Sequence, residues 1–268
     1  MNLAQSGIPL LGMGTWGMGG KFERDDGNFD ESVAALRYGL SLGLNLIDVA
    51  EIYGEGLSEE IVGKAIVEVA REDVYVVSKV WKTNLRHSDV LEAAEASLKR
   101  LNTDYIDLYL IHWPNDEISL EETMKALESL LEQRKIRAIG LSNFSTELMS
   151  EAQSYLKHAK IAANQIEYNL GARAAESDII PYCKQNDIRV IAYRPFAKGS
   201  LAISSSKIQD ELAKKYKKTP NQIALNWLIS QGISAIPKSS DHGHLKENAG
   251  ALGWHLSIED VELLRSAT

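Results

Sequence analysis

The amino-acid sequence predicts a (β/α)8 barrel with an N-terminal hairpin, formed by one domain that spans residues 1–268. Short apolar segments rich in β-branched residues alternate along the chain with longer segments of helical period. The short segments are almost continuously hydrophobic, which is typical of parallel strands that are covered on both faces. No Pro- or Ser-rich linker interrupts this alternation, so we expect one closed barrel.

Seven segments have clear strand character, and a weaker eighth lies near Gly250–His255. The seven span residues 44–49, 74–80, 105–112, 136–142, 160–168, 188–193 and 233–237. The helical segments span residues 30–43, 57–70, 87–102, 119–135, 145–158, 174–187 and 219–232. This number of strand–helix units favours a closed barrel over the alternative, an open doubly wound sheet.

The boundaries of these segments carry their own signals. Ser or Thr stands near the start of several predicted helices, where such side chains cap free backbone N–H groups. These predicted N-caps are Ser58, Ser88, Ser119, Ser145 and Thr219. The segment GIPLLGMGTW, residues 7–16, precedes the first helix, and we expect it to form a short hairpin or plug outside the repeat.

Composition limits which binding partners and which cellular compartment are expected for the protein. The formal net charge of −8 argues against nucleic acid or an anionic membrane as the main partner. Cys183 is the single cysteine, so we expect a buried thiol in a reducing, cytoplasmic protein. The N-terminal segment lacks the cationic start of a signal peptide, and its apolar run is too short to span a membrane. No exposed apolar stripe is evident, so we expect a monomer.

A glycine-rich motif near the N-terminus has a misleading form. Residues 12–17 read GMGTWG, which matches the G-x-G-x-x-G pattern of dinucleotide-binding folds. That pattern binds a pyrophosphate only where a strand precedes it and a helix begins at its last glycine. Here Gly19, Gly20 and a charged stretch follow, so we expect these glycines to form turns near a ligand instead.

Four residues with reactive side chains follow apolar segments in the first half of the chain: Asp48, Tyr53, Lys79 and His112. The Lys79 ammonium is costly to bury unless a partner such as Asp48 lies beside it. That ammonium would lower the pKa of Tyr53, about 10 in a free tyrosine, and make it a better proton donor. His112 could hydrogen-bond the same substrate oxygen. Singly, each residue has an ordinary structural explanation, but together at neighbouring strand ends they indicate a proton-transfer site.

Other chemistries find less support in the sequence. No metal-ligand spacing is present, and the two histidines of His242-Gly243-His244 have no further ligands nearby in the sequence. No Ser or Cys stands with a paired base, so hydrolysis is not favoured. Polar residues end the remaining four strands and complete a ring around one pocket. These are Ser142, Asn143, Gln165, Tyr193, Arg194, Lys238 and Ser239.

The order and spacing of eight segments resemble the aldo-keto reductase family over essentially the whole chain, in the short form of prokaryotic members. The segments are GMGTW, LIDVAEIYG, VVSKVW, LYLIHWP, IGLSNF, NQIEYN, AYRPFAKG and IPKSSDHGHLKEN. The resemblance implies an NADPH-dependent reductase of aldehydes and ketones, with NADH as an alternative donor and no metal. It places Asp48, Tyr53, Lys79 and His112 at the family's catalytic positions, with Tyr53 as the proton donor. His112 favours carbonyl reduction, because members that reduce steroid carbon–carbon double bonds have glutamate there.

The same resemblance implies a set of cofactor contacts. Ser142, Asn143 and Gln165 are expected to bind the nicotinamide carboxamide, and Tyr193 to stack on its ring. The full set is Thr15, Trp16, Asp48, Ser142, Asn143, Gln165, Tyr193, Arg194, Pro195, Phe196, Lys198, Gly199, Leu201, Lys238, Ser239, Ser240, His244, Glu247 and Asn248. Arg194 stands where many members have serine, and His244 where most have an arginine for the 2′-phosphate of NADPH. Because neutral histidine carries less charge, dual use of NADH is expected beside a preference for NADPH.

The resemblance also implies a pocket for a small-molecule carbonyl substrate. Its expected lining is Trp16, Tyr53, Trp81, His112 and Trp113. The chain stops at Thr268, where longer members continue into a loop over the pocket, so we expect an open pocket with modest selectivity. The alternative function is a regulatory subunit that binds the nicotinamide cofactor and has only incidental turnover.

Overall fold

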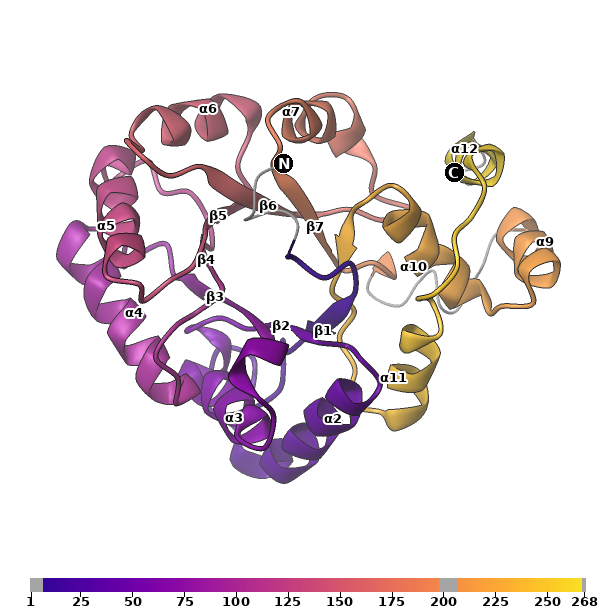
Figure 1. The fold of residues 1–268 in the computed structure, drawn as a ribbon, viewed down its shortest axis with the longest axis horizontal. Helices are drawn as coiled ribbons and strands as arrows, with labels where there is room; N and C mark the ends of the chain where they lie inside the picture. The colour runs from indigo at the N-terminus through magenta and orange to yellow at the C-terminus, as the bar shows by residue number, and fades with distance from the viewer. Residues whose placement is uncertain (1–6, 198–206, 267–268) are drawn as a thin grey trace.

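A computed structural model describes residues 7–197 and 207–266 of the chain. Eight parallel strands form a central barrel, and helices surround it as an outer ring (Figure 1). The predicted (β/α)8 barrel, the TIM-barrel fold, is therefore confirmed. None of the helices in the described ranges is both long and apolar enough to cross a membrane.

Each strand pairs in parallel with the next one along the chain, so the order around the barrel follows the sequence. The strands are β1 (Gly12–Gly14), β2 (Leu46–Asp48), β3 (Tyr75–Val80), β4 (Leu108–Ile111), β5 (Ile139–Ser142), β6 (Ile161–Glu167), β7 (Arg189–Tyr193) and β8 (Ser234–Ala235). Isolated parallel bridges, Leu11 with Ala235 and Gly14 with Lys238, close the barrel between its first and last strands.

The helices follow the strands in the expected alternation. They are α2 (Phe29–Ser41), α3 (Leu57–Ile66), α4 (His87–Leu101), α5 (Leu120–Glu132), α6 (Thr146–Ser154), α7 (Ile179–Gln185), α9 (Lys207–Tyr216), α10 (Pro220–Ser230), α11 (His242–Ala249) and α12 (Ile258–Ser266). Four short 3-10 turns are η1 (Asp26–Asn28), η2 (Tyr53–Gly56), η3 (Arg71–Asp73) and η4 (Ala174–Glu176). Helix α11 packs against α2, which completes the outer ring between the end and the start of the chain.

Three of the five predicted N-caps are confirmed. The side chains of Ser119, Ser145 and Thr219 each accept a hydrogen bond from a backbone N–H in the first turn of α5, α6 and α10. The prediction was wrong for Ser58 and Ser88, because α3 and α4 already begin after the preceding residues Gly56 and Arg86.

The eighth strand does not lie where the sequence pattern placed it. Residues 250–255 contain no strand, whereas Gly12–Gly14 forms β1 and pairs in parallel with β2 inside the barrel. The two glycines gave this segment weak strand character, but the packing requires glycine here. A Cβ atom on Gly12 would lie 2.3 Å from Leu46 Cδ2 and 2.5 Å from the Leu46 carbonyl oxygen. The glycines that made β1 hard to recognise in the sequence therefore also allow it to pair closely with β2.

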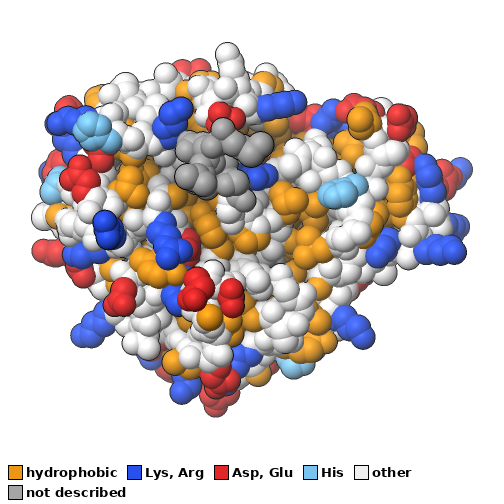
Figure 2. Space-filling model, viewed as in Figure 1, with side chains coloured by type: hydrophobic (Ala, Val, Ile, Leu, Met, Phe, Trp, Pro, Cys, Tyr) orange, Lys and Arg blue, Asp and Glu red, His pale blue; other side chains and the backbone are white. Residues whose placement is uncertain are grey.

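The expectation that residues 7–16 form a hairpin or plug outside the repeat was wrong for Gly12–Gly14, because these residues are the first strand of the barrel. Ile8 is buried with Leu46 and Leu108, which belong to the apolar cluster inside the barrel. Figure 2 shows the molecule from the same side as Figure 1. Hydrophobic side chains appear near the centre of this face, and charged side chains of both signs are interspersed around them.

Strand periodicity decides which side chains enter the barrel. In β3, Val77 belongs to the interior cluster, while Val76 and Val80 pack in the outer core beneath the helices. Ser78 also faces outward, because its hydroxyl donates a 2.5 Å hydrogen bond to Glu59 of α3. Successive strand residues point to opposite faces, so Lys79 points inward. The outer core contains Cys183, whose thiol is buried as predicted, and burial raises its pKa to about 12.

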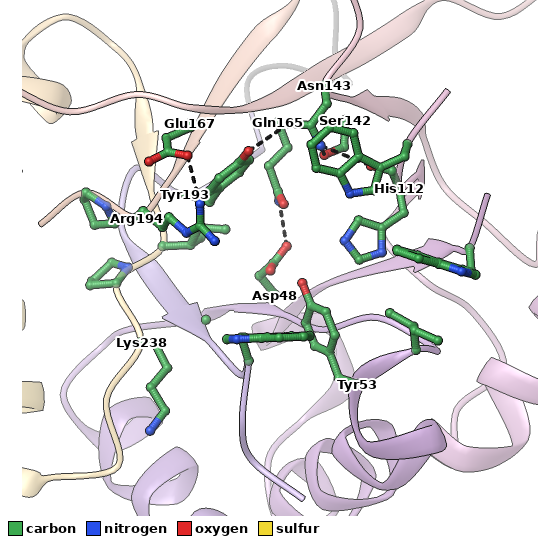
Figure 3. Close-up of a pocket in the computed structure, with 18 of the residues that line it drawn as sticks. Asp48, Tyr53, His112, Ser142, Asn143, Gln165, Glu167, Tyr193, Arg194 and Lys238 are labelled. Atoms are coloured by element: carbon green, nitrogen blue, oxygen red, sulfur yellow. Dashed lines mark hydrogen bonds and ion pairs between the residues drawn. The ribbon is translucent and has the colours of Figure 1, made fainter. Parts of the chain in front are cut away.

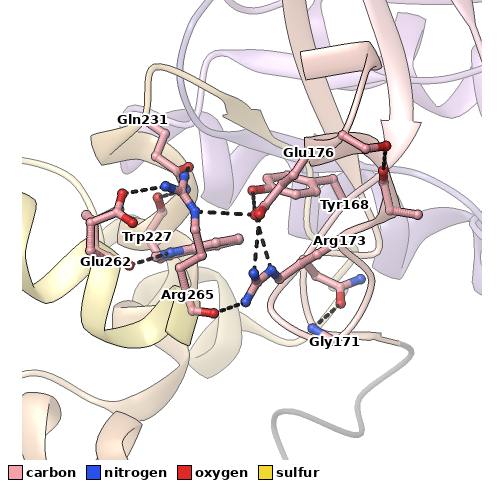
Figure 4. Close-up of polar contacts among 12 residues, drawn as sticks. Tyr168, Gly171, Arg173, Glu176, Trp227, Gln231, Glu262 and Arg265 are labelled. Carbon is pink, nitrogen blue, oxygen red and sulfur yellow. Dashed lines mark hydrogen bonds and ion pairs between the residues drawn. The ribbon is translucent and has the colours of Figure 1, made fainter. Parts of the chain in front are cut away.

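A polar cluster holds the C-terminal helix α12 to the body of the barrel (Figure 4). Arg265 Nε lies 3.6 Å from Glu176 Oε1, and the same guanidinium donates to Gln231 Oε1 at 2.6 Å. Glu176 accepts a 2.6 Å hydrogen bond from Tyr168, the residue after β6. Helix α12 is thereby connected to the end of a barrel strand.

Candidate active site

A cavity of about 610 Å³ lies at the C-terminal ends of the strands (Figure 3). This is the end at which (β/α)8 barrels carry their active sites. The residues that line it are Gly14, Trp16, Phe22, Asp48, Ile52, Tyr53, Trp81, His112, Trp113, Ser142, Asn143, Gln165, Glu167, Tyr193, Arg194, Pro195, Phe196, Ile236, Pro237 and Lys238. All five residues predicted to contact substrate are among them.

Lys79 lies behind the cavity floor and joins two of the predicted catalytic residues. Its Nζ donates to Asp48 Oδ2 at 2.9 Å, to the Val49 carbonyl oxygen at 2.8 Å and to the Tyr53 hydroxyl oxygen at 3.3 Å. An ammonium has three N–H donors, so all three are in use. Since the Tyr53 oxygen accepts from Lys79, the phenolic proton remains available to a partner in the cavity.

Tyr53 owes its position to the turn that follows β2. It begins η2, in which Gly54 and Gly56 have positive φ angles of 55° and 90°. The Gly54 backbone N–H donates to the Lys21 carbonyl oxygen at 2.8 Å, and a Cβ atom on Gly54 would lie only 2.0 Å from the Gly19 oxygen. Glycine at position 54 therefore lets the loop after β1 contact the segment that carries Tyr53.

The electrostatics of this cluster differ from the prediction in one respect. Burial by itself lowers the pKa of the Lys79 ammonium, but Asp48 and Tyr53 outweigh it and the pKa is raised. Burial raises the pKa of Tyr53, and although Lys79 acts in the opposite direction, as predicted, it does not reverse the shift. The expectation of a lowered Tyr53 pKa was therefore wrong for the protein without ligands, because it left out the desolvation of the phenolate.

His112 lies directly after β4, beside Tyr53, and the centroids of the two rings are 5.7 Å apart. Both side chains point into the cavity (Figure 3). Burial and the nearby Lys79 ammonium lower the pKa of His112 to about 2, so the imidazole is neutral at physiological pH. Its Nδ1 atom is buried and has no hydrogen-bond partner among the residues that the structure describes.

Amide and hydroxyl side chains at the ends of β5, β6 and β7 form two hydrogen-bonded groups, which the backbone bond from the Asn143 N–H to the Gln165 carbonyl oxygen, 2.9 Å, joins. Gln165 Nε2 donates to Asp48 Oδ1 at 2.6 Å. Asn143 Nδ2 donates to Ser142 Oγ at 2.9 Å, and Asn143 Oδ1 accepts a 2.9 Å hydrogen bond from the Tyr193 hydroxyl. The structure therefore brings together the four residues predicted to contact nicotinamide, and connects them to Asp48.

An ion pair lies on the neighbouring wall. Arg194 donates to Glu167 Oε2 at 2.9 Å (Figure 3). The Arg194 carbonyl oxygen accepts a 2.9 Å hydrogen bond from Asn169 Nδ2. Glu167 was missed in the sequence, although a signal existed: it lies two residues after Gln165 on one strand and shares its face. The apolar lining residues Phe22, Ile52, Ile236 and Pro237 were also missed, since none of them carries a reactive group.

Several predicted cofactor residues lie outside the cavity lining. The Thr15 side chain is behind the wall, where its hydroxyl donates to the Asp48 carbonyl oxygen at 3.0 Å and accepts from Ser58 at 2.8 Å. At the start of α11, Asp241 accepts from the His244 backbone N–H at 2.8 Å, and the His244 side chain is exposed. The others near α11 that do not line the cavity are Ser239, Ser240, Glu247 and Asn248. Lys198, Gly199 and Leu201 lie outside the described residues.

No group of three or more His, Cys, Asp or Glu side chains that could hold a metal ion occurs within residues 7–197 and 207–266. Of the two histidines considered as a metal pair, His242 stacks on Tyr38 of α2, with ring centroids 4.3 Å apart.

The sequence model of the Aldo/keto reductase family matches residues 10–268. The chain belongs to the aldo/keto reductase family. Membership confirms the predicted family and enzyme class, a reductase of aldehydes and ketones. Among curated relatives, this aldo/keto reductase is 41% identical to methylglyoxal reductase YeaE of Escherichia coli, over 97% of the present chain and 91% of that reductase. It is 37% identical to a glyoxal reductase of Bacillus subtilis, over 95% and 87% of the two chains.

Solved structures agree with this assignment. The thermostable aldo-keto reductase Tm1743, crystallised with the inhibitor epalrestat, superposes with a TM-score of 0.94 and 43% identity, covering 100% of this aldo/keto reductase and 99% of that chain. An aldo-keto reductase of Klebsiella pneumoniae in complex with NADPH gives a TM-score of 0.87 and 39% identity, with 97% and 90% of the two chains covered.

Proposed function

We propose that this aldo/keto reductase reduces an aldehyde or ketone to the alcohol with NADPH as the hydride donor and Tyr53 as the proton donor. The observation that carries the proposal is the bonding of Lys79. Its three donors are bound to Asp48, Val49 and Tyr53, and the Tyr53 hydroxyl keeps its proton for the cavity. A reductase needs such a proton at the carbonyl oxygen.

The residues present fit a nicotinamide cofactor, and the NADPH complex of the Klebsiella relative supports it. When bound, NADPH supplies a hydride to the carbonyl carbon. The network of Ser142, Asn143 and Gln165 offers donors and acceptors for a carboxamide, and the Tyr193 ring lies beside it. The cations Arg194 and Lys238 line the same cavity and suit the pyrophosphate and the 2′-phosphate. We propose that the remaining residues of the predicted cofactor set also contact NADPH.

The substrate oxygen is proposed to lie between Tyr53 and His112. His112 donates one N–H to the oxygen and orients it, and the low pKa that burial gives this residue keeps the imidazole neutral while it does so. Tyr53 transfers its proton to the oxygen as the carbon receives the hydride. The Lys79 ammonium then stabilises the phenolate until solvent returns a proton.

The choice of substrate and cofactor follows from the relatives and from the region around α11. Reductases of methylglyoxal and glyoxal are among the relatives, so we propose small dicarbonyl aldehydes among the substrates. With an exposed histidine at position 244, NADPH is preferred and NADH is also used. We further propose that residues 1–268 act as one domain, as a cytoplasmic monomer.

The test is the oxidation of NADPH, and separately of NADH, with methylglyoxal and with benzaldehyde. Tyr53→Phe is expected to lower kcat by roughly 10²–10⁴-fold, since general acid catalysis is lost, while NADPH binding is retained. The control Tyr155→Phe removes an exposed hydroxyl from the end of α6 and is expected to leave kcat unchanged. Tight NADPH binding without turnover of either aldehyde would instead support the regulatory alternative.

A further inference from the structure

Phe22 is an unusual member of the cavity wall. It lies in the charged stretch KFERDD between β1 and α2, and 57% of its surface is exposed. Large exposed hydrophobic side chains are few in the described part of the chain, and three of them, Trp16, Phe22 and Trp113, line this one cavity. Exposed aromatic rings gathered at one mouth commonly indicate a contact surface for a ligand.

The Phe22 ring begins an unbroken series of edge-to-face ring contacts that runs from the surface to the proposed reaction centre. Phe22 contacts Trp16 with centroids 5.0 Å apart, and Trp16 contacts Tyr53 at 4.8 Å. Tyr53 contacts His112 at 5.7 Å, and His112 contacts Trp81 at 5.1 Å. Phe22 is therefore the outermost ring of an aromatic wall whose inner members surround the carbonyl position.

The backbone on both sides of Phe22 is held in place. The Lys21 carbonyl oxygen accepts the 2.8 Å hydrogen bond from Gly54. On the other side, the Asp25 backbone N–H donates to the Gly19 carbonyl oxygen at 2.9 Å. A ring that is exposed yet carried by a fixed backbone needs little ordering when a ligand binds, so its contact with a ligand is pre-organised.

We propose that Phe22 is a specificity-determining residue that binds an aryl group carried by the substrate a few bonds away from the reacting carbonyl. The inference rests on the proposed function and names a substrate class for the same site. Phe22 lies beside Trp16, whereas the residues proposed for the cofactor's pyrophosphate and 2′-phosphate, Arg194 and Lys238, are cationic and do not offer an apolar surface. An uncharged aryl aldehyde is therefore favoured over a short aliphatic one.

The test uses propanal and 3-phenylpropanal, which share the reacting group and differ by one phenyl ring. Phe22→Ala is expected to lower kcat/KM for 3-phenylpropanal about tenfold, the order of a lost aromatic contact, and to leave propanal unchanged. Phe22→Tyr should retain wild-type selectivity. Ile258→Ala, which removes an exposed hydrophobic side chain from α12, is the matched control and should change neither substrate. Equal effects on both aldehydes, or none, would overturn the proposal.

Binding of 3-phenylpropan-1-ol to the cofactor-free protein separates this inference from the proposed function. Trp16, Trp81 and Trp113 line the cavity, so tryptophan fluorescence reports its occupation. About tenfold weaker binding in Phe22→Ala is expected whether or not the protein turns over aldehydes. Unchanged binding refutes the role of Phe22, whereas failure of turnover alone in the wild type refutes only the proposed reaction.

Discussion

Lys79 and His244 are both basic residues at the proposed cofactor and substrate site, but they differ in burial and in the number of their polar contacts. The Lys79 side chain is 0% exposed, and Asp48, Val49 and Tyr53 take all its donors. The His244 side chain is 71% exposed, and its Nδ1 atom lies 3.8 Å from the Asp241 carboxylate. Packing fixes the Lys79 side chain, whereas the exposed His244 side chain is not enclosed by the residues that the structure describes. Chemistry and cofactor preference therefore depend on physically separate regions.

The largest effect is expected where a buried charge loses its partner. Lys79→Met leaves the Asp48 carboxylate buried and unpaired, which should lower the free energy of unfolding by about 3–5 kcal/mol. The double variant Lys79→Met/Asp48→Asn should recover much of this loss without recovering activity. Urea unfolding measures both.

The exposed pair Lys125–Glu121 on α5 provides the matched control for this experiment. Lys125→Met should cost below about 0.5 kcal/mol, because exposed pairs within a helix contribute little. Equal losses for Lys79→Met and Lys125→Met would contradict the distinction between the buried and exposed charges.

A smaller effect should appear in the pH dependence of stability. The pKa of His112 is about 2 in the folded protein and about 6.5 in an unfolded chain. Below pH 6.5 the unfolded chain therefore binds a proton that the folded protein does not, and stability falls as the pH falls. The expected slope from this residue is up to about 1.4 kcal/mol per pH unit.

Urea unfolding of the wild type and of His112→Gln at pH 7 and pH 5.5 isolates this contribution. The difference in stability between the two pH values should be smaller in the variant. An identical difference in both proteins would show that His112 titrates in the folded state.

The smallest effect is expected at the exposed region. His244→Arg should lower the Kd of NADPH by about threefold to tenfold, because an exposed guanidinium strengthens a phosphate contact modestly, and should leave that of NADH unchanged. His255→Arg adds the same charge outside the cavity lining and serves as the control. Fluorescence titration measures the Kd values, and urea unfolding should show no change. A parallel gain for NADH would place His244 away from the 2′-phosphate.

The fold and the reactive cluster could be predicted because each depends on a regular pattern. Strand periodicity places Lys79 inside the barrel, and parallel strands bring Asp48 and His112 to the same end. Features that depend on tertiary contacts between distant segments were harder to predict from the sequence. The position of β1 depends on the close approach of Gly12 to Leu46, which no local pattern of hydrophobicity records.

Within the site, the residues that were missed are those whose role depends on a loop or on a partner. Phe22 lines the cavity next to Lys21, whose carbonyl oxygen accepts a hydrogen bond from Gly54, a contact between segments that are separate in the sequence. The sign of the Tyr53 pKa shift required the extent of its burial as well as the presence of Lys79. The sequence identifies the charges, but desolvation depends on the assembled structure.

The junction between the first and last strands bears on where the barrel opens locally. Among the described residues, only isolated bridges join the ends of the barrel at β1 and β8, supported by hydrogen bonds from the Gly14 N–H to the Pro237 carbonyl oxygen, 3.1 Å, and from the Ala235 N–H to the Leu10 carbonyl oxygen, 2.9 Å. Gly14 and Lys238, which form one of the closing bridges, also line the cavity. Local opening is therefore expected first at this junction between β1 and β8, which we call the seam. A ligand that contacts residues on both sides of the seam stabilises the closed barrel. Amide hydrogens along the seam should then exchange more slowly with solvent, while those between β6 and β7 remain unaffected.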